Sequence, residues 1–509
     1  MSANLATDPW LRTIDTEGRR QVLSLADAFE HAHRVGALGD PHPLQRGATL
    51  RLMLAIAYTA LGSPAGHGAY VQQHAAGLDG PKVAEWLRLN ADRFDLHHPS
   101  HPFAQNAAMR GVVDEPGVVK PATILLPHAA GEGPTLFDHR HSHSGVALTW
   151  QEAAVALLAR QMYSVGGIQP FTAKPFGAVA RTGKLAVCTR RPLCYAEGRT
   201  LAETIALNLV PVPNLGAFNY SWTSREKRTI GAQRTPDGTV DALTFLCRSM
   251  ILLPDEDGLI RRAMMCEGER YGAGGGDDAA TKEPTDPALV PHTLLDDSDI
   301  PLNVSTKRPV WRMVLSAAAT PERKGLLGAL EDLPEAQRGH VRLTVIGQAT
   351  QKSRIDGHVV GTVPLPVKAF YGEQATAVDK AILDQRSTIY KGALAVGAAV
   401  HASTNSAGDV AKRVSETTGV AFTRVLARDV PQLFTGTLTI DAFCKNLADE
   451  GDAALEVGAA PWEPAARYQA GASAAAAVTG TRDRAEKRRQ REATKAEKAT
   501  PAPESEEAA

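Results

Sequence analysis

The sequence predicts an α+β fold: a large mixed domain over residues 1–365, an all-α four-helix bundle over 366–480 and a disordered tail over 481–509. Three observations support this prediction. The chain has 509 residues, which is too many for a single hydrophobic core. Helix-type and strand-type apolar patterns both occur before the proline-marked segment 362–369. After that segment the strand-type patterns largely vanish, so a helical bundle is expected there.

The first part of the mixed domain is predicted to be mainly helical. Ser24 is a suitable N-cap for a helix over SLADAFEHAH, which the prolines at positions 41 and 43 would end. Residues 47–62 carry the pattern of a buried helix that a glycine closes. Residues 81–94 predict a further helix with proline in its first turn.

The middle of the mixed domain combines both kinds of pattern. Residues 149–163 have alanines and leucines at helical spacing, and residues 199–210 predict a helix that is followed by two prolines. Residues 122–126 and 185–189 each predict a short strand. Residues 243–254 have the apolar, β-rich composition of a strand in a sheet core.

The last part of the chain changes from mixed to helical. Residues 270–287 are rich in glycine and charge and predict a mobile loop. Thr320 is the predicted N-cap of a helix over PERKGLLGALEDL, and residues 340–349 predict a strand that runs into the polar turn TQKSRIDGHVV. The tail has almost no large apolar residue, which is typical of disorder. The four predicted bundle helices cover residues 375–400, 407–428, 439–455 and 463–478.

Charge, cysteine content and hydropathy narrow the class of protein. The formal net charge is −1, so no global basic field attracts the chain to nucleic acid, and any such contact must use local basic patches. The five cysteines form no CxxC pair, which argues against a thiolate zinc site and against a disulfide framework. No secretory signal and no apolar run long enough to span a bilayer occur, so we expect a cytoplasmic protein without membrane contact.

The sequence lacks the common catalytic motifs. It has no GxxxxGK[ST] phosphate loop, no GxSxG nucleophile elbow and no HExxH zinc motif. The alternative of a metal-dependent hydrolase depends on two histidine-rich stretches between His97 and His143 that could form an imidazole–carboxylate site. We favour polar loop residues that are satisfied by backbone or water, and we expect no metal, no cofactor and no enzymatic activity. The histidine-rich set is His97, His98, His101, His128, Asp138, His139, His141 and His143.

A glycine-rich stretch, Ser164–Lys184, follows the predicted helix 149–163 and is here called the glycine loop. Gly166 and Gly167 are adjacent, and Lys174 follows them. Because glycine has no Cβ and accepts positive φ, this backbone could approach a flat or polyanionic partner closely. Taken alone, the pair favours an ordinary helix C-cap before a surface loop.

Several stretches, taken in order, resemble the large-subunit (CasA) family of type I-E CRISPR Cascade surveillance complexes. The resemblance covers most of residues 8–465. Its amino-terminal part consists of Trp10-Leu11 with SLADAF, then RLMLAIAYTAL, FDLHHPSHPFAQ, and TLFDHRHSHSG ahead of the helix that ends in the glycine loop. Its later part consists of TIALNLVPVP, DALTFLCRSMILL, EGERY and TVIGQATQKSRI, followed by a helical carboxy-terminal domain.

The resemblance implies a non-catalytic subunit for antiviral defence. Members of this family act within CRISPR RNA-loaded Cascade assemblies and recognise a short motif beside the target, the PAM, in double-stranded DNA. The family also promotes strand opening and R-loop formation and recruits a helicase-nuclease. A scaffold that binds only protein is a third possibility for this chain.

The resemblance also implies roles for individual residues. The PAM-contacting glycine loop corresponds to Gly166, Gly167 and Lys174. The wedge that separates base pairs corresponds to Gln351 or Lys352, because a one-residue shift leaves the tip open. A lysine finger should lie in 266–282, where both Arg270 and Lys282 remain candidates, and the loop that docks near the guide RNA comprises Phe137, Asp138, His139 and Arg140.

Basic residues of the predicted bundle could contact DNA. Part of this set is expected to share one helix face and to bind phosphate in a salt-dependent, sequence-independent manner. The alternative is a solvated helix surface. The residues are Lys391, Lys412, Arg413, Arg424 and Arg428.

Overall fold

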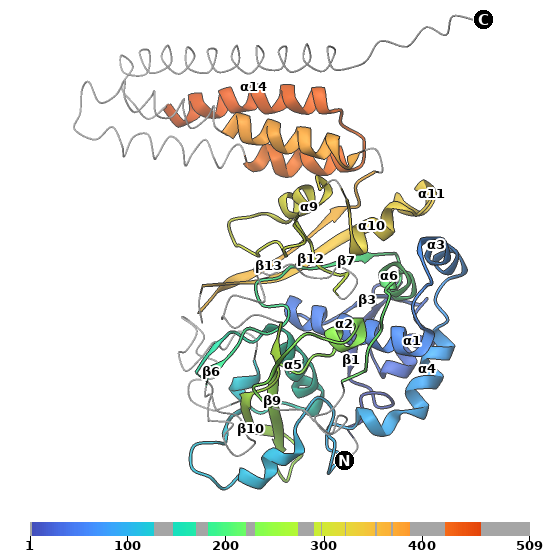
Figure 1. Cartoon of the computed structure of the whole chain (residues 1–509), viewed down its shortest axis with the longest axis vertical. Coiled ribbons are helices and arrows are strands. Elements are labelled where there is room, and N and C mark those ends of the chain that lie inside the picture. Colours follow the sequence, from blue (N-terminus) through green and yellow to red (C-terminus); the bar gives the residue numbers. More distant parts are fainter. Residues whose placement is uncertain are drawn as a thin grey trace, which may run out of the picture. The chain divides into compact units, whose positions relative to one another are not determined.

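The computed structural model divides the chain into two compact units, Met1–Gly372 and Glu373–Ala509 (Figure 1). The predicted boundary at residue 365 lies just before this division. In the part of the chain that the structure describes, no helix is long and apolar enough to cross a membrane. The described residues are 3–126, 146–168, 182–219, 230–272, 290–296, 298–320, 322–351, 354–367, 370–386 and 423–459.

Helices and strands alternate along the described part of the first unit. Its α-helices are α1 (Leu25–Glu30), α2 (Pro43–Leu61), α3 (His67–Ala76), α4 (Gly80–Leu89), α5 (Trp150–Tyr163), α6 (Leu201–Asn208), α7 (Thr239–Leu243), α9 (Val310–Ala318), α10 (Gly325–Glu331) and α11 (Glu335–Arg338). Its 3-10 helices are η1 (Ala91–Phe94), η2 (Ala107–Val112) and η3 (Ala122–Leu125).

The strands of this unit form several small sheets, with neighbour orders β2-β1-β3, β4-β10-β9, β11-β8, β13-β12-β7 and β5-β6. These strands are β1 (Leu11–Asp15), β2 (Arg20–Leu23), β3 (Val35–Leu38), β4 (Lys120–Pro121), β5 (Gly167–Ile168), β6 (Thr182–Gly183), β7 (Leu193–Glu197), β8 (Gln233–Arg234), β9 (Arg248–Pro254), β10 (Ile260–Glu267), β11 (Arg270–Tyr271), β12 (Arg342–Gln351) and β13 (Arg354–Pro364).

Local capping explains where the first helices begin and end. Ser24 caps α1 as predicted, since its hydroxyl accepts a hydrogen bond from the Asp27 backbone N–H at 3.0 Å. The prediction that Pro43 ends a helix is wrong: α2 starts there, because proline is tolerated in a first turn whose N–H groups have no helical partner. His42 caps this end, and Gly62, with φ +85°, closes α2 as predicted.

The core of the first unit contains α2 and α5, which pack against each other (Figure 1). Thr149 begins α5 with a capping box: its hydroxyl accepts a hydrogen bond from the Glu152 N–H, and the Glu152 carboxylate accepts one from the Thr149 N–H. Arg51 of α2 is buried, and its guanidinium donates to the Ala242 carbonyl of α7 at 2.8 Å. A charged side chain therefore ties α2 to α7 inside the core.

Two of the predicted short strands are wrong. Residues Ala122–Leu125 form the 3-10 helix η3 rather than a strand. Residues 185–189 turn against the end of α5, where the Ala186 N–H donates to the Ser164 carbonyl and the Cys188 N–H to the Met162 carbonyl. The apolar side chains of this segment are buried, and two of its backbone donors satisfy carbonyls at the end of α5.

The longest described strands belong to the β13-β12-β7 sheet (Figure 1). The strand predicted over 340–349 is confirmed as β12, which pairs with β13 on one side and β7 on the other. The helix predicted to start after Thr320 begins only at Gly325 as α10. The reason is tertiary: the Leu326 N–H donates to the Pro291 carbonyl, and a Cβ at Gly325 would lie 2.7 Å from that oxygen.

The described part of the second unit is helical. Residues 373–386 and 423–434 are helical, and α14 covers Ile440–Ala459. The helix end predicted at residue 428 is wrong, because this helix continues to residue 434 through Pro431. The rest of the predicted bundle lies outside the described residues. The buried apolar residues of the described helices are Ala375, Val378, Ile382, Val425, Leu426, Val430, Leu433, Phe434, Phe443 and Leu447.

Candidate functional site

The base of the glycine loop is a short hairpin that continues directly from α5. Strand β5 pairs antiparallel with β6, and Gly167 lies opposite Gly183. Gly167 has φ +126°, a backbone conformation that residues with a side chain rarely adopt. A Cβ at Gly166 would lie 3.3 Å from the Gly183 carbonyl oxygen. The glycine pair therefore fits the close pairing of this hairpin, whereas the C-cap of α5 is Ser164 and not a glycine. Lys174 lies outside the described residues.

A buried arginine holds the two sides of this hairpin together. Arg248, at the start of β9, is 2 % exposed. Its guanidinium donates to the Val165 carbonyl at 2.8 Å and to the Lys184 carbonyl at 2.7 Å, and also to its neighbour's carbonyl at Cys247. Burial lowers the pKa of Arg248. Because Val165 and Lys184 are on opposite sides of the glycine loop, this one side chain fixes the separation of its ends.

A buried glutamine in turn fixes the backbone of Arg248. The Gln161 side chain, on α5, accepts a hydrogen bond from the Arg248 N–H at 2.9 Å and donates to the Arg248 carbonyl at 2.8 Å. It also donates to the Ala104 carbonyl. Arg248 and its bonds to the two ends of the glycine loop are here called the arginine clamp. The clamp is thus positioned by α5, the helix that leads into the glycine loop.

The predicted wedge lies at the carboxy-terminal end of β12, where this strand is still paired with β13. Gln351 pairs with Arg354 of β13, so residues 352 and 353 connect the two strands. A Cβ at Gly347 would lie 2.4 Å from a methyl carbon of Val304, which shows how closely that neighbour covers the strand. The Gln351 side chain and Lys352 lie outside the described residues. The predicted strand is present, but the turn predicted over 350–360 is wrong for most of its length, because residues 350–351 belong to β12 and residues 354–360 to β13.

Of the two finger candidates, the structure describes only Arg270. Its guanidinium pairs with the buried Glu267 carboxylate, with Nε to Oε1 at 2.7 Å. Arg270 lies in β11, beside β8. A role as a finger would require this guanidinium to leave a carboxylate that is 1 % exposed. Lys282 lies outside the described residues.

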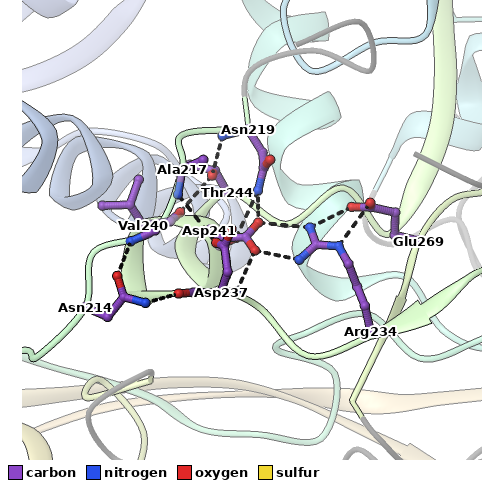
Figure 2. Close-up of polar contacts among 10 residues, drawn as sticks. Asn214, Ala217, Asn219, Arg234, Asp237, Val240, Asp241, Thr244 and Glu269 are labelled. Atoms are coloured by element: carbon purple, nitrogen blue, oxygen red, sulfur yellow. Dashed lines mark hydrogen bonds and ion pairs between the residues drawn. The ribbon is translucent and has the colours of Figure 1, made fainter. Parts of the chain in front are cut away.

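Next to β11, Figure 2 shows a second charged cluster centred on Arg234. Its guanidinium donates to Asp241 at 2.5 and 2.9 Å and to Glu269 at 3.1 and 2.9 Å. Both carboxylates are buried, and the guanidinium lies 4.4 Å from the centre of the Phe245 ring. Burial alone raises the pKa of Asp241, but hydrogen bonds from Arg234 outweigh it and leave that pKa below its ordinary value.

The Asp241 carboxylate also organises the backbone around it (Figure 2). It accepts hydrogen bonds from the Asp237 N–H at 2.9 Å and from the side-chain amide of Asn219. The Asn219 N–H donates to the Thr244 hydroxyl at 2.9 Å. The cluster therefore joins three chain segments, around residues 219, 237–241 and 269, to the strand that carries Arg234.

Two of the five predicted bundle residues are described, Arg424 and Arg428, and they lie four positions apart on one helix and so on one of its faces. Arg424 is exposed. Arg428 pairs with Asp429 at 2.5 Å and with Glu450 of α14 at 2.6 Å, so its charge is already balanced within the bundle. Lys391, Lys412 and Arg413 lie outside the described residues, and so do the docking-loop residues Phe137, Asp138, His139 and Arg140.

The histidines of the first cluster are used in local turns. The His98 and His101 rings stack at 3.9 Å, and the His101 N–H donates to His98 Nδ1 at 3.0 Å. Burial lowers the pKa of His97, which disfavours its charged form. Among the described residues, no group of three or more His, Cys, Asp or Glu side chains is arranged to hold a metal ion. His128, His139, His141 and His143 lie outside that part of the chain.

Sequence reasoning missed the buried polar residues that support these loops: Gln161, Arg248 and the Arg234–Asp241–Glu269 cluster. The available signal was weak. Arg248 is the one charged residue within the apolar run LTFLCRSMILL, which is unusual for a strand in a sheet core. Nothing in the local pattern of Arg234 or Gln161 distinguishes either from an exposed residue.

The chain is similar to known proteins over nearly its whole length. Residues 4–469 match the family described as CRISPR-associated protein Cse1. A CRISPR-associated protein CasA/Cse1 of Thermus thermophilus is 28% identical over an alignment of 379 residues, and the match covers 71% of this chain and 71% of that protein.

Solved structures share the fold. A Thermus thermophilus CasA (Cse1) structure has a TM-score of 0.72 and 21% identity, covering 94% of this chain and 98% of that one. Cse1 from Acidimicrobium ferrooxidans has the same TM-score and identity, with 96% and 99% covered. A chain of a CRISPR RNA-guided surveillance complex has a TM-score of 0.68 and 19% identity, with 94% and 98% covered.

Proposed function

Because the chain belongs to the CRISPR-associated Cse1 family, we propose that it is the non-catalytic large subunit of a type I-E CRISPR RNA-guided surveillance complex. In this role it recognises the PAM in double-stranded DNA, promotes strand opening and R-loop formation, and recruits the helicase-nuclease. The similarity in fold to a chain of such a complex supports this proposal.

The observation that carries the proposal is the clamped base of the glycine loop. A minor groove offers only a degenerate pattern of hydrogen-bonding groups, so it suits contact by backbone and a few basic side chains. Gly166 and Gly167 supply a backbone without side chains, and Arg248 fixes where that backbone lies. We assign PAM contact to Gly166, Gly167 and Lys174.

The paired strands β12 and β13 support the assignment of a wedge. Unstacking a base step costs a few kcal/mol, so the element that inserts must resist bending. A turn between two long paired strands meets this requirement. We assign the wedge to Gln351 and Lys352, and the guide RNA then captures the opened strand.

Two further roles complete the proposal. Lys282 is the better finger candidate than Arg270, because Arg270 is already paired with buried Glu267. Docking in the RNA-loaded assembly is assigned to Phe137, Asp138, His139 and Arg140. Among the bundle candidates, Arg424 is exposed and suited to contact phosphate, whereas Arg428 would first have to release two carboxylates.

The test is a PAM-library binding assay with the reconstituted assembly, with and without this chain. We expect selection of a short motif only when the chain is present. Equal DNA affinity without the chain would favour the scaffold alternative. Stoichiometric metal in the purified protein together with hydrolytic activity would favour the hydrolase alternative.

A first variant tests the glycine pair. Gly167→Asp places a side chain where φ is +126°, so the hairpin base must distort, and it adds a charge that repels phosphate. We expect PAM-dependent affinity to fall about tenfold or more, which corresponds to about 1.4 kcal/mol. Gly68→Asp is the matched control, because nothing lies within 4 Å of a Cβ there and φ is not positive.

Filter binding on duplexes with and without the motif gives the readout. Assembly with guide RNA should be the same for both variants and the parent. Parental affinity in Gly167→Asp would show that the glycine pair serves only the local hairpin and not PAM contact.

A further inference from the structure

The strand that leads to the wedge is joined to the end of α5 through one buried side chain. Gln348 of β12 is fully buried, and its Nε2 donates to the Tyr163 carbonyl at 2.8 Å. Tyr163 is the last residue of α5, three positions before Gly166. Gln348 likewise lies three positions before Gln351. The Gln348 amide therefore links a residue three positions before the glycine pair to a residue three positions before the wedge.

A second link runs through Thr189. Its hydroxyl donates to the Ser164 carbonyl at 2.9 Å, and its backbone forms a parallel bridge with Gln348. The next residue, Arg190, donates through Nε to the Thr350 hydroxyl at 2.9 Å. Arg190 has φ +66°, a conformation that costs a residue with a side chain some stability. The segment between the two functional elements thus contacts both of them.

These links use carbonyls that a helix cannot satisfy by itself. The last four carbonyls of an α-helix have no partner within the helix and need a cap, water or another segment. In α5 the Tyr163 carbonyl is satisfied by β12 rather than by a local cap. The end of α5 is therefore bonded to a strand far away in the sequence.

Strand β12 and helix α5 each have other contacts that stabilise them without the Gln348–Tyr163 hydrogen bond, which is here called the joint. Strand β12 keeps its pairing with β13 and β7, and α5 keeps its capping box and its contact with α2. The amide of Gln348 therefore sets how the two elements are placed relative to each other, more than whether either one forms.

We propose that Gln348, assisted by Thr189, is a positioning residue that locks the base of the glycine loop to the wedge hairpin. PAM contact and strand opening then act on one rigid frame, so that DNA held by the glycine loop is presented to the wedge at a fixed offset. This inference deepens the proposed function and rests on it for its consequence in DNA opening.

The joint is tested first without DNA. Spin labels at Ile168→Cys and Val360→Cys occupy exposed positions on β5 and β13, in a Cys444→Ser background that removes the one described cysteine that is not buried. The parent should give one narrow distance distribution. Gln348→Met, which keeps the side-chain length and removes the donor, should broaden it. An unchanged distribution in a folded variant overturns the joint.

The second measurement is strand opening by the reconstituted assembly. Gln348→Met should leave PAM-duplex affinity within about twofold and slow R-loop formation on relaxed DNA about tenfold. Negative supercoiling should restore much of the rate, because it supplies opening energy from outside the protein. Thr189→Val should act in the same direction and more weakly, because the Ser164 carbonyl also accepts from the Ala186 N–H.

Thr344→Val is the matched control. It removes a buried hydroxyl from the same strand, where Thr344 meets Thr362 of β13, away from the joint. Its opening rate should equal the parent's. The proposal is contradicted if Gln348→Met opens relaxed DNA at the parental rate. It is also contradicted if this variant loses PAM-duplex affinity and opening rate to the same extent and supercoiling does not restore the rate. If Gln348→Met broadens the distance distribution but the parent shows no PAM-dependent binding, the structural link through Gln348 is supported and the proposed function is rejected.

Discussion

Replacing Arg234 with methionine is expected to lower the free energy of unfolding by about 3 to 5 kcal/mol, the usual cost of leaving a buried ion pair without one partner. The loss is large because Asp241 and Glu269, which are 0% and 3% exposed, both pair with this guanidinium. Urea unfolding, followed through the transition of the first unit, measures the effect.

The loss of stability in Arg234→Met should become smaller as the pH is lowered. In the parent, folding lowers the pKa of Asp241. Its contribution to the free energy of unfolding is therefore complete above the pKa of the unfolded chain and is lost as the pH falls through the pKa of the folded state. Without Arg234, burial raises that pKa, and the carboxyl becomes neutral in mild acid. The difference between parent and variant should therefore shrink as the pH is lowered.

Two further variants control this experiment. Adding Asp241→Asn and Glu269→Gln to Arg234→Met removes the two buried negative charges and should recover part of the loss. Arg88→Met breaks an ion pair with Glu30 in which both side chains are over a third exposed, and it should cost less than about 1 kcal/mol. If Arg234→Met costs no more than Arg88→Met, the cluster is not a structural centre of the first unit.

Arg248→Met should have the largest effect on DNA recognition. It removes the donors to the Val165 and Lys184 carbonyls and frees the two sides of the glycine loop. Hydrogen bonds from a charged donor contribute about 1.5 to 3 kcal/mol each. Losing about 3 kcal/mol of loop positioning corresponds to roughly a hundredfold weaker PAM-dependent binding.

Arg248→Lys should be intermediate, because lysine keeps the charge but lacks the planar fork that serves two carbonyls at once. Arg160→Met is the matched control. Arg160 is also a buried arginine, and in the described part of the chain it donates to the Ile124 carbonyl, whereas Arg248 donates to the two ends of the glycine loop. It should lower stability while PAM-dependent binding by the folded protein persists. A folded Arg248→Met with parental binding would contradict the clamp.

Where an element is defined by its own residues, its local sequence predicted it. Ser24 and the apolar run after it define α1, and Thr149 with Glu152 defines the start of α5. Strand β12 was recognised because its apolar residues and polar turn lie within one short window. The resemblance to the CasA family, drawn from motif order alone, is confirmed by the family match over residues 4–469.

The incorrect predictions share one physical cause. Residues 185–189 have the composition of a strand, but their N–H groups bond the carbonyls at the end of α5. The helix expected from Thr320 begins at Gly325, because the chain there approaches Pro291. In each case a distant segment took the hydrogen bonds that local propensity would have used, and propensity is a weak prior against tertiary contacts.

Sequence alone therefore determined the family, the main helices and strand β12, since these depend on short-range spacing and residue type. Only the tertiary structure decided which buried groups support them. Gln348 bonds Tyr163 across 185 positions, and Arg248 bonds Val165 across 83. The partner of a buried polar side chain is set by the carbonyl that the fold leaves unsatisfied beside it. That information exists only once distant segments are packed together.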